Sequence, residues 1–209
     1  MPSTILSEAK AISAHFTYSD QNKIVSGFML ALRDARGATG RDPSSGSILY
    51  PNKTGCWLGA IGYCTLLDQI GSCFKDKKKS IIQGNTISKA LGYFTRLSQS
   101  EIDVIYALRN AFAHDFSLSN INNVRPHLTH RFKVTRGSSH PLITLPFTPW
   151  DGDYLNYTAQ NETVVNLERF GNLVESVYLT LINLHKNRDL EIVLPGGSDE
   201  LIRRYMIGL

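Results

Sequence analysis

The sequence predicts a mainly α-helical domain, a bundle of four or five helices with one small β-hairpin insert. Apolar residues recur at helical spacing over most of the chain, and the alternation typical of strands appears only between residues 118 and 160. The chain has 209 residues, of which 42% are hydrophobic and 19% are charged. This length and composition are typical of one soluble domain, so we expect residues 1–209 to form a single unit.

The first helix is expected at about residues 20–36, where apolar side chains follow the helical period and Gly37 ends the pattern. The next segment, 37–54, is rich in Gly, Ser and Pro, which break regular structure. We therefore expect a long loop between the first and second helices.

The apolar run at 55–73 predicts a buried helix, because Asp68 is its only charged residue. A lysine-rich segment at 75–79 follows, which predicts a solvated loop or a patch that steers phosphates. A third helix is then expected at about 85–97.

The fourth helix is expected to begin near residue 101. Ser100 and Asp103 form a capping-box pattern, and Glu101 adds negative charge to the first turn, where the helix dipole favours it. One apolar stripe follows at helical spacing. Its members are Ile102, Ile105, Leu108, Phe112 and Phe116.

A β insert of about residues 118–160 is expected after this helix. The segment 130–135 alternates like a strand, Gly137 opens a turn, and 142–145 can return as the second strand of a hairpin. Nearby prolines bound these strands or confine them to an edge. The last long helix is expected at about 163–187.

Composition and motifs exclude several classes of protein. The three cysteines are odd in number and lack C-x-x-C spacing, so neither a disulfide framework nor a zinc site is expected. His127 and His130 form an H-x-x-H pair without a carboxylate third ligand, so we expect no metal and no cofactor. There is no secretory pattern and no apolar run of membrane-spanning length, which predicts a cytoplasmic protein without membrane contact.

The fourth helix carries the best candidates for catalytic residues. Arg109 falls within the apolar stripe, where a charge must reach solvent or find a partner. Asp68 is a candidate for that role, either by pairing with Arg109 or by positioning His114; alternatively, it reaches solvent at the helix edge. Arg109 and His114 are five positions apart, so their directions on a straight helix differ by roughly 140°.

A second face of this helix suggests an interface. Asn110 and His114 are four residues apart and therefore share a side, which Ala107 and Ala111 border. Small residues permit the close approach of another backbone. We therefore expect a homodimer that forms through the face carrying Ala107, Asn110 and Ala111.

The segment from Arg109 to His114 resembles the R-x4-6-H signature of HEPN domains, in the common form with a polar residue after the arginine. The resemblance implies an α-helical bundle, a homodimer, and RNA cleavage without a metal, as in toxins and phage-defence ribonucleases. It also implies that His114 is the general acid or base, that Arg109 binds the scissile phosphate, and that Asn110 orients the phosphate or the imidazole.

The resemblance has one departure and leaves two alternatives. In one branch of the family a tyrosine two residues after the histidine is modified by a partner nucleotidyltransferase. Phe116 occupies that position here, so an antitoxin of that type is not expected, and another antitoxin or protein partner stays open. The alternatives are a catalytically idle module that pairs with itself or a partner, and a structural role in which Arg109 snorkels and His114 faces the helix dipole.

A net charge of +4 is only mildly basic and permits an RNA substrate without requiring one. The β insert holds basic residues near Phe132 and Tyr154, which predict either an RNA-binding surface or a solvated face. These candidate RNA-binding residues are Arg125, Arg131, Lys133 and Arg136.

Overall fold

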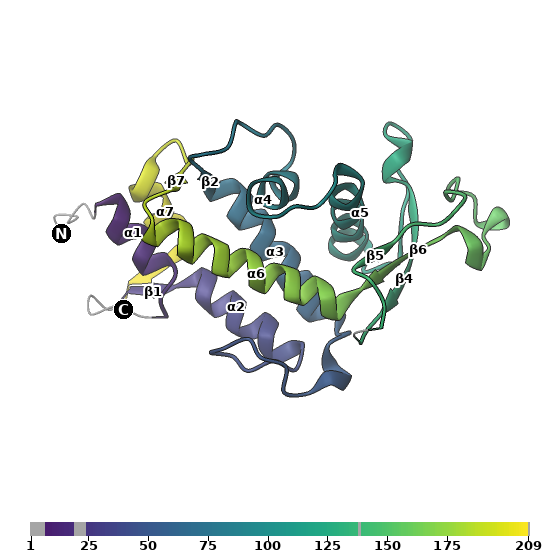
Figure 1. Cartoon of the computed structure of the whole chain (residues 1–209), viewed down its shortest axis with the longest axis horizontal. Coiled ribbons are helices and arrows are strands. Elements are labelled where there is room, and N and C mark those ends of the chain that lie inside the picture. Colours follow the sequence, from purple (N-terminus) through teal and green to yellow (C-terminus); the bar gives the residue numbers. More distant parts are fainter. Residues whose placement is uncertain (1–6, 19–23, 138, 209) are drawn as a thin grey trace.

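The computed structural model describes residues 7–18, 24–137 and 139–208, and within them the chain is mainly helical (Figure 1). In the view of Figure 1, α6 runs from the α1 end toward the strands β4, β5 and β6, with α2 below it and α4 above it. The described part contains these helices: α1 (Glu8–His15), α2 (Gly27–Ala38), α3 (Trp57–Cys73), α4 (Thr86–Phe94), α5 (Gln99–Asp115), α6 (Leu167–Lys186) and α7 (Gly197–Tyr205).

Within the described residues, the strands are short and form three separate sheets. The same residues contain four short 3₁₀ turns, at Pro51–Lys53, Pro126–Leu128, Tyr154–Asn156 and Ala159–Asn161. The strands are β1 (Ile24–Ser26), β2 (Phe74–Asp76), β3 (Ser119–Asn120), β4 (His130–Thr135), β5 (Ile143–Thr144), β6 (Glu162–Asn166), β7 (Leu190–Ile192) and β8 (Met206–Gly208).

The expected helices exist with shifted ends. The first begins at Gly27 rather than near residue 20, because Ser26 accepts a hydrogen bond from the Met29 amide as its N-cap, and residues 24–26 form β1 instead. Residues 19–23 lie outside the described part. The helix expected at 55–73 starts at Trp57, and the one expected at 85–97 spans only Thr86–Phe94. The short α1 and α7 were not predicted.

The fourth expected helix, α5, begins two residues before the predicted start. Its N-cap is Ser98, whose side chain accepts from the Glu101 amide while the Glu101 carboxylate accepts from the Ser98 amide at 2.8 Å. The expected capping box of Ser100 and Asp103 is therefore wrong. The helix ends at Asp115 because Phe116 adopts a left-handed conformation with φ of 50°.

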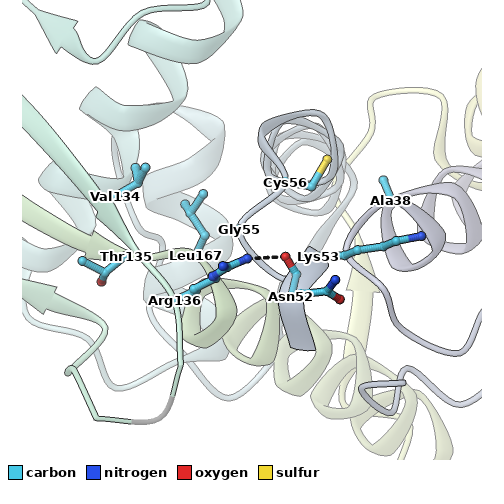
Figure 2. Close-up of a pocket in the computed structure, with 9 residues that line it drawn as sticks. All are labelled: Ala38, Asn52, Lys53, Gly55, Cys56, Val134, Thr135, Arg136 and Leu167. Carbon is cyan, nitrogen blue, oxygen red and sulfur yellow. Dashed lines mark hydrogen bonds between the residues drawn. The ribbon is translucent and has the colours of Figure 1, made fainter. Parts of the chain in front are cut away.

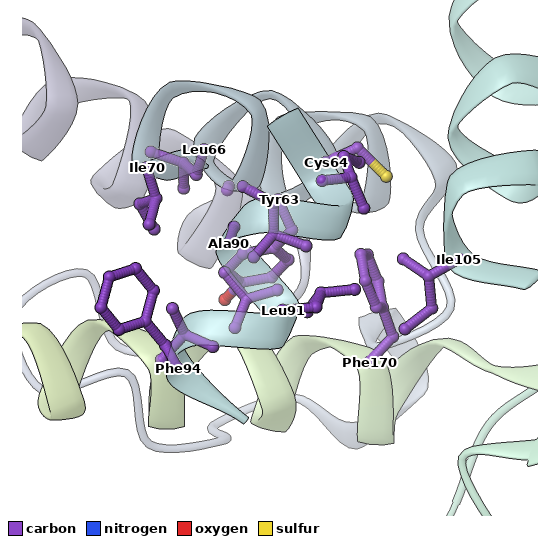
Figure 3. Packing of buried hydrophobic residues seen from close by; sticks show 14 of the residues in the cluster. Tyr63, Cys64, Leu66, Ile70, Ala90, Leu91, Phe94, Ile105 and Phe170 are labelled. Atoms are coloured by element: carbon purple, nitrogen blue, oxygen red, sulfur yellow. The ribbon is translucent and has the colours of Figure 1, made fainter. Parts of the chain in front are cut away.

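The core is centred on α3, which packs against α2, α4, α5 and α6. Buried Tyr63, Leu66 and Ile70 of α3 lie in one cluster with Leu91 of α4 and Phe170 of α6 (Figure 3). Burying a side chain of this size contributes about 1.5–3 kcal/mol. Tight packing on both sides of α3 explains why its sequence is apolar all round.

Four strands form a sheet at the end of the molecule opposite to α1 and α7 (Figure 1), in the order β3, β4, β6, β5. The expected hairpin between 130–135 and 142–145 is wrong, because β6 lies between β4 and β5. It pairs in parallel with β4, and antiparallel with β5. The last helix therefore begins at Leu167 rather than 163, since the preceding five residues belong to β6.

The two ends of the chain are joined by short antiparallel pairings. Strand β1 pairs with β8, so that Ile24 lies opposite Gly208. Strand β2 pairs with β7, so that the start of the expected lysine-rich loop, Lys75, is in fact a strand residue opposite Glu191. Helices α1 and α7 pack against each other beside β1 and β8.

His15 of α1 is fully buried among aromatic rings. The rings of Phe16, Phe28 and Phe74 have their centroids 5.2–5.4 Å from the imidazole. Neither ring nitrogen of His15 has a hydrogen-bond partner among the described residues. Burial disfavours the charged imidazolium and lowers the pKa of His15 to about 3.

The long loop that precedes α3 is held against α6 by buried arginines. Arg36 forms a two-point ion pair with Glu175, with Nε–Oε1 and Nη2–Oε2 distances of 2.9 and 2.7 Å, and its Nη1 donates to the carbonyl oxygens of Pro43 and Ser44. The Tyr63 hydroxyl donates to the same carboxylate at 2.9 Å. A loop without regular structure is thus fixed by charged hydrogen bonds.

We expect Glu175→Gln to lower the free energy of unfolding by about 3 kcal/mol, because it leaves the Arg36 charge buried without a counter-charge. Glu191→Gln is the matched control. Its ion pair with Lys75 is more exposed, so its loss should cost less than about 1 kcal/mol. Urea unfolding of the two variants measures the difference. Equal losses of unfolding free energy would show that the buried ion pair stabilises the fold no more than the exposed one.

No described helix has the length and apolar character needed to cross a bilayer.

Candidate functional site

Of the alternatives open for Asp68, the structure shows the pairing with Arg109. Arg109 leaves α5 toward the neighbouring α3, and its Nε donates to Asp68 Oδ2 at 2.8 Å. The two side chains keep 29% and 24% of their surface exposed. The guanidinium is therefore held in one orientation at the surface, where a ligand can reach it.

A residue of α4 completes the support of Arg109. The Thr86 hydroxyl donates to Oδ1 of Asp68, so both carboxylate oxygens have a partner. This contact requires a close approach of α3 and α4 at Gly71, where an added Cβ would lie 1.8 Å from the Thr86 carbonyl oxygen. Sequence reasoning does not find Thr86, because one threonine at the start of a helix carries no signal of its own.

Asn110 lies beside Arg109 and contacts it directly. Arg109 Nη1 donates to Asn110 Oδ1 at 3.3 Å. The Nη2 group of Arg109 makes no hydrogen bond to any described residue. Asp68, Arg109 and Asn110 thus form one partly exposed polar cluster, in which the arginine keeps donors for an anion.

His114 is not part of this cluster. It is exposed in the last turn of α5, near the negative end of the helix dipole, and no described residue bonds to it. The α-helix is continuous from Gln99 to Asp115. At 100° per residue the directions of Arg109 and His114 differ by roughly 140°, and one copy of the chain does not aim both at one phosphate.

The expected dimer face is wrong. Ala107 is fully buried and Ala111 is 2% exposed, and both belong to the core of their own chain. Their small side chains serve packing within the bundle rather than contact with a second copy. The exposed side of α5 instead carries Ala113 and His114, with Asn110 at its border.

The four candidate RNA-binding residues of the β insert have different partners, although Arg131 and Lys133 are linked through Tyr157 and Glu162. Arg131 donates to the Leu118 carbonyl oxygen and lies 5.4 Å from the centroid of the Tyr157 ring. Lys133 lies 4.0 Å from the Glu162 carboxylate. Arg136 donates to the Asn52 carbonyl oxygen, on a different loop. Arg125 is exposed before a 3₁₀ turn.

The two aromatic residues expected beside them differ in accessibility. Phe132 is 1% exposed, so it cannot stack on a base, because it belongs to the core under the sheet. Tyr154 is exposed, and its hydroxyl lies 2.7 Å from Ser119 Oγ. Only Tyr154 of this pair keeps a ring face for a ligand.

His127 and His130 have separate partners. His127 Nε2 lies 3.8 Å from Asp103 Oδ2, whereas His130 Nδ1 lies 2.9 Å from the Thr163 hydroxyl. Burial lowers the pKa of His130. Within the described ranges, no three His, Cys, Asp or Glu side chains gather in a way that could hold a metal ion.

The helices α3, α4 and α5 therefore bring together Asp68, Thr86, Arg109 and Asn110 on one surface, and leave His114 at the end of α5. This arrangement can bind an anion and orient it. A proton-transfer group at the same anion has to come from elsewhere, for example from another copy of the chain. No family model matches this chain, and neither a curated protein nor a solved structure is similar to it.

Proposed function

We propose that this protein is a metal-independent endoribonuclease of the HEPN type, acting as a toxin or a phage-defence effector. The observation that supports this function is the partly exposed guanidinium of Arg109, whose Nε is held by Asp68 at 2.8 Å and whose Nη1 contacts Asn110. A preorganised planar donor is what the negative charge on a cleaving phosphate requires.

In this proposal His114 supplies acid and base catalysis. An imidazole can accept the proton of the ribose 2′-OH near neutral pH, and the 2′-oxygen then attacks the adjacent phosphorus. The bond to the 5′-oxygen breaks, and this oxygen leaves as a hydroxyl after receiving a proton. Arg109 stabilises the charge on the phosphate, and Asn110 orients the guanidinium beside it. The products are a 2′,3′-cyclic phosphate and a 5′-hydroxyl.

The proposed active form is a homodimer. Because Arg109 and His114 of one helix diverge by roughly 140°, His114 of one copy has to act on the phosphate bound by Arg109 of the other. The contact then uses the exposed side of α5, with Ala113 and its border residue Asn110, instead of the buried alanines. An antitoxin or other protein partner would control the activity by covering the same surface.

A catalytically idle module that binds a partner protein is the second candidate. Val124, Phe147 and Leu155 support it, because all three lie in the β insert and are almost completely exposed. Where such side chains gather in one patch, they are typical of protein contact surfaces. In this case the cluster at Arg109 stabilises the fold, and RNA is not cleaved.

Incubation of the purified protein with total RNA distinguishes the two candidates. We expect cleavage that persists in EDTA, yields 2′,3′-cyclic phosphate ends, and leaves DNA of the same sequence intact, because the nucleophile is the 2′-OH of the substrate. Analysis of the RNA ends by enzymatic phosphorylation and ligation provides the measurement. Intact RNA, or cleavage that chelation abolishes, would instead favour the partner-binding module.

A further inference from the structure

A pocket lies where the loop before α3 meets the end of β4. None of the residues of the proposed nuclease site lines it. Its volume is about 490 Å³, which is within the range of small-molecule sites. Figure 2 shows the residues around it. They are Ala38, Asn52, Lys53, Gly55, Cys56, Val134, Thr135, Arg136 and Leu167.

Two cationic side chains line this pocket. Arg136 comes from the end of β4, and its Nη1 donates to the Asn52 carbonyl oxygen, which leaves further guanidinium donors beside the pocket (Figure 2). Lys53 comes from the 3₁₀ turn before α3, and its Nζ lies 5.2 Å from the centroid of the Tyr50 ring. No carboxylate is among the described residues that line the pocket, so neither cation is neutralised there.

Two further features favour an anion at the same place. The Asn52 side chain adds an amide that can donate hydrogen bonds. Cys56 is the N-cap of the 17-residue helix α3 and lines the pocket, so the positive end of that helix dipole lies at its wall. The electrostatic field in the pocket therefore favours negative charge. Its main source is the pair of cationic side chains.

The remaining wall is apolar. Ala38 of α2, Val134 of β4 and Leu167 of α6 contribute it, and these residues come from three elements of the packed core. A ligand that combines an anionic group with a flat apolar ring can contact both parts of the pocket at once. Nucleotides have this combination, because a phosphate lies one sugar away from an aromatic base.

We propose that this pocket binds the phosphate monoester of a nucleotide, either a free mononucleotide or the phosphorylated 5′ end of an RNA. Arg136 and Lys53 hold the phosphate, and the wall of Ala38, Val134 and Leu167 takes the sugar or base. The site does not depend on the nuclease, so it should be intact in a protein whose His114 has been replaced.

Calorimetric titration of the His114→Ala protein tests the site without cleavage of the probe. We expect adenosine 5′-monophosphate to bind at least about 10-fold more tightly than adenosine, because hydrogen bonds to a charged group are among the stronger ones. Arg136→Ala and Lys53→Ala, each placed in the same background, should weaken this binding by about 10-fold or more. Arg33→Ala is the matched control, since Arg33 is an exposed arginine of α2 that pairs with its neighbour Asp34.

A second pair of probes separates the two sources of the phosphate. If a short oligoribonucleotide with a 5′-phosphate binds more tightly than the same oligomer with a 5′-hydroxyl, the pocket takes an RNA end; if only the mononucleotide binds, the pocket takes a free nucleotide. Equal binding of adenosine and its monophosphate would overturn the proposal. So would unchanged binding in both Arg136→Ala and Lys53→Ala proteins whose thermal unfolding matches that of the parent.

Discussion

Replacement of His114 by alanine is expected to reduce RNA cleavage by 100- to 10,000-fold, the usual loss when an acid or base catalyst is removed. The fold should be unaffected, because the imidazole is exposed at the end of α5 and no described residue bonds to it. Cleavage rates under single-turnover conditions measure the loss. His140→Ala, which removes an exposed histidine in the β insert, is the matched control and should cleave RNA like the parent.

Arg109→Ala should reduce cleavage by a similar factor, but it also leaves Asp68 without its cation. Arg109→Lys separates the two effects, since lysine keeps the charge beside Asp68 and loses the planar fork of donors. We expect the lysine variant to unfold at nearly the parental temperature and still to cleave slowly. Full activity in His114→Ala or in Arg109→Lys would assign the cleavage to another site or to a contaminant.

The second large effect is expected from pH. An unfolded chain binds a proton on His15 below about pH 6.5, whereas the folded chain resists protonation until about pH 3. The unfolded state therefore holds more protons between these values, and the free energy of unfolding falls as the pH falls through this window. A fall in the pKa of His15 from 6.5 to about 3 corresponds to a total loss of about 5 kcal/mol, of which about 2 kcal/mol is lost by pH 5.

Urea unfolding at pH 7.5 and pH 5 measures this effect, with His15→Phe as the comparison. The phenyl ring is similar in shape and cannot be protonated, so the variant should lose about 2 kcal/mol less than the parent between the two pH values. In the variant, the free energy of unfolding should still fall with decreasing pH, but less steeply. The remaining fall is expected because burial also lowers the pKa of His130 and of His185. The same dependence of unfolding free energy on pH in both proteins would show that His15 is protonated in the folded state.

The part of the fold that depends on local pattern could be predicted from the sequence. The helical spacing of apolar residues identifies α3 and α5, and their interiors agree with the structure even where a cap moves the first residue. The order of the strands could not be predicted in this way. Strands β4 and β6 are joined by long-range pairing, whereas an alternating pattern followed by a turn favours the nearest partner, β5.

The candidate site shows the same division. The pairing of Asp68 with Arg109 could be predicted as one alternative, because Asp68 is the only charge in α3 and Arg109 falls within the apolar stripe of α5, so each needs a partner. The burial of Ala107 does not follow from its size, because a small residue permits close packing with its own chain as readily as with a second copy. Thr86 and the pocket beside Lys53 depend on tertiary contacts that no spacing records.

The pairing of β1 with β8 determines when this end of the fold can form during synthesis. Residues 24–26 have no partner strand until residues 206–208 have been made, and about 180 residues have to be added between them. At about 5–20 residues per second, this takes roughly 10–40 s on the ribosome. Throughout this period β1 is an unpaired edge, and α1 lacks its contact with α7. Nascent chains that have not yet released residues 206–208 therefore cannot close this end of the fold.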